Sequence, residues 1–235
     1  GISSDNDTIW ILFTSGLEGG IITHPLGTKG SPTTSSVEPP VTPEISEAIV
    51  LAPFFDHFSP LDESDHIASK LSKIWGPTSA IKNSAVTVNL MKVIPQYGVV
   101  SISSHGSINS KDQVQIFTRE KATLLNRLRH IFDLMTGRIA VESGYYVIRP
   151  SFIRHYGRCG YPRSLIYISA CHSKANESMS NAFLDKGAYT YFGYDKWVWP
   201  SFTYSIGTRL FNYLVDDGKT TGEAFIALGN KIDPN

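Results

Sequence analysis

Short apolar runs recur along the chain and alternate with segments of helical period. Four of them have the length of a strand: residues 48–52, 99–103, 163–169 and 188–192. A run that is apolar at nearly every position is typical of a strand buried on both faces. Strands that alternate with helices indicate βαβ units, which build a mostly parallel sheet covered by helices on both sides. The pattern therefore predicts an α/β fold.

In the segments between these runs, apolar residues recur at helical spacing. In residues 62–75, Ile67, Leu71 and Ile74 share one helical face, and the acidic first turn suits a helix N-terminus. We expect further helices at residues 87–97, 119–135, 178–186, 201–215 and 221–228, and further strands at 79–82, 114–117, 139–141 and 145–148. Residues 111–150 are less regular than the rest, which indicates an insertion into the alternating pattern.

The first 43 residues differ in composition from the rest of the chain. Residues 8–13 are typical of a strand, but residues 14–42 lack periodicity and are rich in Gly, Pro, Ser and Thr. Such a composition favours a loop or linker. We therefore divide the chain into an N-terminal strand with a flexible arm, residues 1–43, and a main domain, residues 44–235.

The bulk composition argues against several classes of protein. Hydrophobic residues make up 41% of the chain and charged residues 18%, as in globular proteins. The formal net charge of zero provides no global basic excess for nucleic acid or an anionic membrane. No apolar run approaches the roughly 18 residues that span a bilayer. Because the chain has neither zinc-type spacing nor a glycine-rich phosphate loop, we expect no metal and no cofactor.

Two reactive residues follow two of the apolar runs. His105 comes after residues 99–103, and Cys171 comes after residues 163–169. Ligands bind beyond the carboxyl ends of parallel strands, and two such ends can be neighbours in space. An imidazole beside a thiol can take its proton and activate it as a nucleophile. The N–H groups of Gly106 and Cys171 are candidate donors to an oxyanion.

Each of these residues also has an ordinary structural interpretation. A buried Cys most often packs as a small hydrophobic residue, and a His before Gly is commonly a turn residue. What favours chemistry is Ser-His-Gly and Ser-Ala-Cys at equivalent strand ends. Cys159 lies in a predicted loop, and His172 is expected to point away from the dyad, so neither is assigned a catalytic role.

The surroundings of the two residues resemble a known family. The segment VVSISSHG (residues 99–106) resembles the strand that presents the general-base histidine in clan CD cysteine peptidases, which include caspases, gingipains, legumains, clostripains and separases. The segment LIYISACHS (residues 165–173) is similar to the strand that presents their nucleophile. GAYTYFGY (residues 187–194) resembles the next strand in bacterial gingipain-like proteins. The resemblance covers roughly residues 48–228.

The resemblance implies a three-layer caspase–haemoglobinase-like fold and a cysteine endopeptidase. His105 and Cys171 would hydrolyse a peptide bond of a polypeptide substrate through a thioester acyl-enzyme, without a cofactor. A bacterial protein that is secreted or displayed at the cell surface is also implied. The chain departs from caspases in having Ser-Ala-Cys-His-Ser where they carry Gln-Ala-Cys-x-Gly. The insertion at residues 111–150 is expected to overhang the cleft.

Three residues are candidates for substrate binding. In this clan the loop after the first central strand helps to build the specificity pocket, and here that loop carries Asp56. Asp195 follows the run at residues 188–192, and Trp197 belongs to an aromatic group that can wall a groove. A carboxylate from Asp56 or Asp195 favours Lys or Arg before the scissile bond. Both carboxylates can equally be loop residues, and Trp197 can equally belong to a core or interface.

Two other functions stay open. A non-proteolytic caspase-fold module of a longer parent chain would bind or regulate without turnover, and an acyl-transferring or other thiol hydrolase would use the same dyad. The presence of both His105 and Cys171 favours the peptidase. If cleavage follows basic residues, Lys29 in the predicted linker is a candidate site of self-processing.

Overall fold

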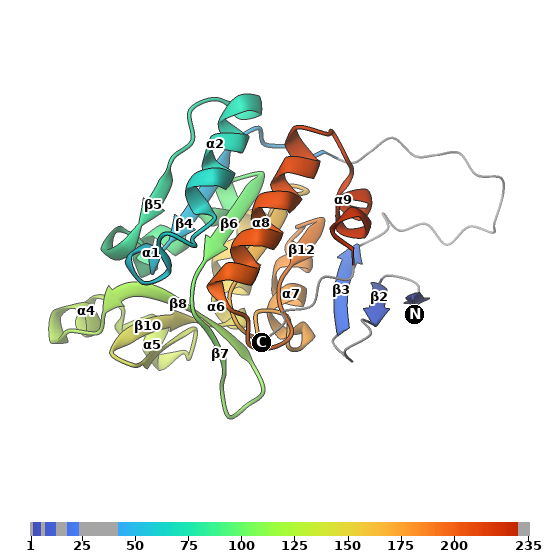
Figure 1. Cartoon of the computed structure of the whole chain (residues 1–235). Coiled ribbons are helices and arrows are strands. Elements are labelled where there is room, and N and C mark those ends of the chain that lie inside the picture. The colour runs from blue at the N-terminus through green and yellow to red at the C-terminus, as the bar shows by residue number, and fades with distance from the viewer. Residues whose placement is uncertain (1, 6–7, 13–17, 24–41, 230–235) are drawn as a thin grey trace.

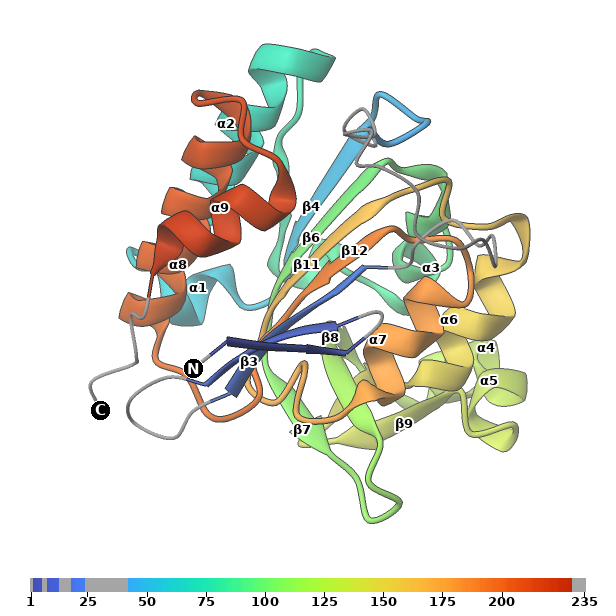
Figure 2. The ribbon, with the colours of Figure 1, turned by 90° about the vertical axis from the view of Figure 1, so that its right-hand side faces the viewer.

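A central sheet with helices on both faces forms the body of the molecule (Figures 1 and 2). The computed structural model describes residues 2–5, 8–12, 18–23 and 42–229. In this part of the chain the sheet has eight strands in the order β1-β2-β3-β12-β11-β6-β4-β5. Its parallel strands are β4 (Ala48–Ala52), β5 (Ala80–Lys82), β6 (Val99–Ser103), β11 (Leu165–Ser169) and β12 (Thr190–Phe192). The predicted α/β class with a mostly parallel sheet is confirmed.

Helices cover the two faces of the sheet in separate groups (Figure 2). One face carries α1 (Phe55–Phe58), α2 (Ser64–Trp75), α8 (Pro200–Val215) and α9 (Thr221–Leu228). The other carries α3 (Val88–Met91), α6 (Pro150–Tyr156) and α7 (Glu177–Leu184). Alternate residues of each central strand enter different cores: Ile166 packs with the α6 and α7 side, whereas Tyr167 packs with the α2 and α8 side. This explains why the central strands are apolar at successive positions.

A smaller antiparallel sheet follows β6. Its order is β7 (Gly106–Ile108), β8 (Val114–Lys121), β10 (Tyr145–Ile148) and β9 (Ile139–Glu142). Two short helices, α4 (Leu124–Arg129) and α5 (Ile131–Met135), lie between β8 and β9. The irregular segment at residues 111–150 therefore has a compact structure of its own, tied to β6 through β7.

Two predicted helices are shorter than expected. The helix predicted over residues 87–97 ends at Met91, and a 3-10 turn, Ile94–Gln96, follows it. Pro95 lacks an N–H and cannot continue an α-helix from the preceding turn. The helix predicted over residues 119–135 begins only at Leu124, because residues up to Lys121 continue β8 and Thr123 caps the helix through Asn126 N–H.

The N-terminal segment joins the main sheet. The predicted strand at residues 8–13 is present as β2 (Thr8–Leu12), and β1 (Ile2–Asp5) pairs with it. A strand that the sequence did not indicate, β3 (Glu18–Thr23), pairs antiparallel with both β2 and β12. The division at residue 43 thus does not coincide with an edge of the sheet. Lys29 lies outside the described residues.

No helix in the described ranges is both long and apolar enough to cross a membrane.

Candidate active site

A cavity of about 420 Å³ opens at the carboxyl ends of β6 and β11. The two strands are adjacent and parallel, with Ser103 opposite Ser169. His105 and Cys171 each lie two residues beyond these serines, and both line the cavity. The parallel register therefore brings together the two residues that the sequence placed at separate strand ends.

Gly106 packs directly on the turn that carries Cys171. A Cβ at position 106 would lie 2.1 Å from the Cys171 carbonyl oxygen and 3.2 Å from the Ala170 Cβ. Only glycine permits this approach without a shift of the backbone. Phe117 N–H donates to the carbonyl of His105 (3.1 Å), which makes Gly106 and Ile116 a non-hydrogen-bonded pair of the β7–β8 ladder. The Gly106 N–H consequently points away from β8.

Aromatic rings surround the His105 imidazole. Its centroid lies 4.5 Å from that of Phe54, 4.9 Å from that of Phe58 and 6.2 Å from that of Phe117. Burial lowers the pKa of His105 below its usual 6.5, and the neighbouring His57 and Arg119 lower it further. The imidazole is therefore neutral at pH 7, which is the form that can accept a proton.

Arg119 of β8 supplies the fixed charge behind His105. Its guanidinium lies 4.6 Å from the ring centroid of Phe54 and forms an ion pair with Asp56 (2.8 Å). A second guanidinium nitrogen lies 3.1 Å from His57 Nε2. Asp56 is thus committed to Arg119 and is not among the described residues that line the cavity.

The Cys171 sulfur faces the loop that follows β12. Val198 N–H donates to the sulfur at 3.5 Å, and the thiol in turn donates to the Val198 carbonyl at 3.6 Å. His172, immediately after the nucleophile, adopts a left-handed conformation with φ 58°. Its N–H donates to the Lys196 carbonyl (3.0 Å), and its ring packs edge-on against Trp197 at 5.0 Å between centroids. The turn after Cys171 and the loop at residues 193–199 therefore hold each other in place.

Two carboxyl groups lie behind the polar floor of the cavity. Ser103 Oγ donates to Asp62 Oδ2 at 3.0 Å, while Asp62 Oδ1 accepts the N–H of Ser64 at the start of α2. The neighbouring Glu63 is 1% exposed. Burial raises the Glu63 pKa to about 7, the charge of Asp62 adds to the increase, and a hydrogen bond with Ser169 partly offsets both. Glu63 Oε2 has no hydrogen-bond partner among the described residues.

The other predicted site residues differ in whether they line the cavity. Trp197 lines it and is 76% exposed, which puts this ring at the mouth and not in a core. Asp195 belongs to the adjoining loop, where its carbonyl lies 3.3 Å from His172 Nδ1, but it is not among the described lining residues. The side chain of Cys159 lies outside the described part of the structure.

The insertion contributes differently from what was expected. None of the described residues that line the cavity comes from residues 111–150, so the insertion does not overhang it. Its β8 instead places Phe117 and Arg119 behind His105. Glu63 was missed at the sequence level because an acidic residue in a helical first turn usually faces solvent. Its only sequence mark is its place beside Asp62 at the start of the long helix that follows the first central strand.

No protein-family model matches the chain, and neither a curated protein nor a solved structure matches it. A thiol and a neutral imidazole line this cavity and provide a nucleophile and a proton acceptor, whereas Gly106 is not among the described lining residues.

Proposed function

We propose that this chain is a cysteine endopeptidase of the clan CD type, built on a caspase–haemoglobinase-like fold. One observation carries the proposal: His105 and Cys171 line one cavity at the carboxyl ends of two adjacent parallel strands. The resemblance of residues 99–106 and 165–173 to the corresponding strands of that clan supports it. So does the contact of Gly106 with the Cys171 carbonyl, which joins the two strand ends into one unit.

The proposed mechanism assigns each group a step. Cys171 Sγ attacks the carbonyl carbon of the scissile peptide bond, and His105 takes the thiol proton. The N–H groups of Gly106 and Cys171 donate to the oxyanion of the tetrahedral intermediate. Collapse breaks the C–N bond, and His105 returns its proton to the leaving amine. Water, deprotonated by His105, then hydrolyses the thioester and releases the acid and the free thiol.

We propose cleavage after Lys or Arg, but the negative charge that would attract the substrate cation does not come from Asp56. Asp56 is neutralised by Arg119, so it offers little attraction to a substrate cation. Ser103 and Ser169 line the cavity, and the carboxyl groups of Asp62 and Glu63 lie directly behind them. A long basic side chain would pass Trp197 and bring its cation towards these hydroxyl groups, where the charge of Asp62 favours positive charge. Because its pKa is about 7, Glu63 is partly protonated at neutral pH and contributes less.

The test is active-site labelling of the full chain. Peptidyl chloromethyl ketones ending in Lys, Arg or Asp are compared, and the adduct is located by mass spectrometry. We expect an adduct at Cys171 with the Lys and Arg reagents. Cys171→Ala should abolish it, and His105→Ala should slow it by roughly a thousandfold or more. His172→Asn is the matched control, because Asn tolerates the left-handed conformation and keeps the turn.

The same experiment distinguishes the alternatives. A folded protein that is not labelled at Cys171 by any peptidyl reagent would be a non-proteolytic binding module. Labelling at Cys159 alone would overturn the dyad. Labelling by the Asp reagent in preference to Lys and Arg would leave the peptidase standing and remove the proposed specificity. A thiol hydrolase or acyltransferase would label without preference and would not cleave polypeptides.

A further inference from the structure

The segment of α4 and α5 carries an apolar surface that faces solvent. The two helices are nearly continuous, because His130 N–H donates to the Asn126 carbonyl and Leu134 N–H to the His130 carbonyl, both at 3.0 Å. Six large apolar side chains on them are between 40% and 78% exposed: Leu124, Leu125, Leu128, Ile131, Phe132 and Met135. We call these six residues the apolar ridge. Figure 1 shows α4 and α5 at a corner of the molecule, at the lower left.

The ridge follows one face of each helix. At about 100° per residue, Leu124, Leu125 and Leu128 fall within an arc of roughly 100° on α4, and the three members on α5 fall within a similar arc; His130 (φ −108°, ψ 21°) separates the two helices. Arg127 and Arg129 project from the two margins of the ridge, one on each side, and both are exposed. Within the described part of the chain neither has a carboxylate partner; Arg127 donates to the Ala122 carbonyl (3.3 Å) and Arg129 to Asn126 Oδ1 (3.2 Å). Lys121, just before α4, is a third exposed cation.

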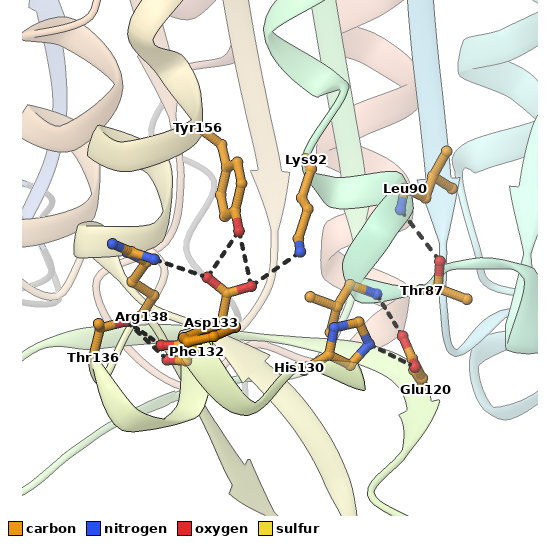
Figure 3. Close-up of polar contacts among 11 residues, drawn as sticks. Thr87, Leu90, Lys92, Glu120, His130, Phe132, Asp133, Thr136, Arg138 and Tyr156 are labelled. Atoms are coloured by element: carbon orange, nitrogen blue, oxygen red, sulfur yellow. Dashed lines mark hydrogen bonds and ion pairs between the residues drawn. The ribbon is translucent and has the colours of Figure 1, made fainter. Parts of the chain in front are cut away.

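The polar side of these helices is the one that packs on the protein (Figure 3). Asp133 is 5% exposed in its side chain and is held by Lys92 (3.0 Å), Arg138 (3.3 Å) and Tyr156 (2.8 Å). His130 is fully buried against Glu120, with 2.9 Å between Nε2 and Oε1. The segment thus reverses the usual amphipathic arrangement, in which the apolar stripe faces the core. The fold leaves most of the apolar ridge facing solvent.

We propose that the apolar ridge docks the protein onto an anionic lipid bilayer. The ridge enters the interface between headgroups and acyl chains, while Arg127 and Arg129 extend to the lipid phosphates on either side. Local charge supports this occupant: the two acidic residues between positions 119 and 138, Glu120 and Asp133, are both buried and bonded. The zero net charge of the whole chain conceals a surface that is locally basic.

The size and charge of the ridge disfavour a second copy as its occupant. Residues 124–135 span roughly 18 Å as a helix, and a stable protein interface uses about 20–30 residues on each side. Pairing two ridges would also place Arg127 and Arg129 of both copies close together without counter-charges. A bilayer needs no complementary shape and supplies the negative charge. The inference does not depend on the chemistry of His105 and Cys171.

Vesicle co-sedimentation of the full chain tests the proposal. We expect binding to vesicles of equimolar phosphatidylcholine and phosphatidylserine, and none to phosphatidylcholine alone. Removing two cations by Arg127→Gln with Arg129→Gln should weaken binding roughly 30-fold. Leu128→Ser with Phe132→Ser should weaken it at least about tenfold, because both side chains lose their insertion free energy. The matched control is Ile226→Ser, which removes a side chain of similar exposure (65%) on α9.

Three results would overturn the proposal. One is failure of the wild-type chain to sediment with the anionic vesicles. Another is unchanged binding after Leu128→Ser with Phe132→Ser, since binding would then be electrostatic adsorption that ignores the ridge. A third is self-association in sedimentation velocity that this double variant abolishes, without vesicle binding; it would assign the ridge to a second copy. Circular dichroism and thermal unfolding verify that each variant is folded.

Discussion

Gly106 and Cys171 meet backbone to backbone: a Cβ at position 106 would lie 2.1 Å from the Cys171 carbonyl oxygen. The contact joins the turn after β6 to the turn after β11, so the position of the nucleophile depends on the residue next to the general base. Any side chain at position 106 must push one of the two turns away.

Gly106→Ala should therefore reduce the reactivity of Cys171 more than it reduces stability. We expect labelling by a peptidyl chloromethyl ketone to slow by roughly a hundredfold, because misplacing reacting groups by about 1 Å has that effect. The free energy of unfolding should fall by about 1–3 kcal/mol, as for overpacking elsewhere. Gly222→Ala in α9 is the control, since nothing lies within 4 Å of the added methyl. Wild-type labelling rates in Gly106→Ala would show that the position of Cys171 does not depend on the absence of a side chain at position 106.

The strand ends that build the cavity could be predicted because local pattern determines them. The central strands are apolar on both faces, so β6 and β11 were visible as runs, and His105 and Cys171 stand immediately after them. Their adjacency follows from parallel register, which βαβ topology favours. Local pattern did not predict β3, because its Glu-Gly-Gly start has no alternation or apolar run typical of a strand. This strand forms by pairing with β2 and β12.

Charge pairing could not be predicted because it depends on tertiary contacts. Asp56 was expected to offer its carboxylate to a substrate, but Arg119, 63 positions later, occupies it. Nothing near either residue in sequence indicates the pair. Glu63 likewise resembles any acidic residue of a helical first turn until α8 closes over it; Gly207 of that helix leaves room, since a Cβ there would lie 2.8 Å from Glu63 Cγ.

Arg119→Met and Asp56→Asn should move the pH dependence of Cys171 alkylation in opposite directions. Arg119 lowers the pKa of His105, so removing its charge should raise that pKa and move the acidic limb of the rate profile to higher pH. Asp56→Asn leaves the Arg119 charge uncompensated, which should lower the pKa of His105 and move the limb to lower pH. Rates of labelling measured across the acidic range test this. Identical profiles for wild type and both variants would exclude His105 as the base.

Asp133→Asn should destabilise the protein and loosen α5. Burial opposes ionisation of Asp133, but hydrogen bonds from Lys92 and Tyr156 outweigh it and hold the pKa below the usual 3.8. A carboxyl group with a lowered pKa contributes stability that is present above its unfolded pKa and is lost as pH falls through the folded pKa. Losing these charge-assisted bonds should cost about 2 kcal/mol in denaturant unfolding at neutral pH. The difference from wild type should shrink in acid.

Asp65→Asn is a suitable control for that measurement. Asp65 also forms an ion pair, with Lys82 at 2.7 Å, but its side chain is 59% exposed. Exposed pairs contribute between about 0 and 1 kcal/mol. An equal effect of the two substitutions would show that burial of Asp133 adds nothing.

Glu63→Gln should stabilise the protein at alkaline pH and remove part of its pH dependence. The unfolded chain releases the Glu63 proton near pH 4.5, whereas the folded protein keeps it until about pH 7. Between these values the native state binds more protons, so stability falls as pH rises from 4.5 and stays low above 7. The loss is on the order of 3 kcal/mol.

Glutamine keeps the shape without the charge, so the stability of the Glu63→Gln variant should exceed that of wild type at pH values above about 8 and approach it near pH 5 in denaturant unfolding. Glu47→Gln, at an exposed position, should leave the wild-type slope unchanged. If Glu63→Gln keeps that slope as well, Glu63 is ionised in the folded protein throughout, and its carboxylate has a partner that compensates for burial.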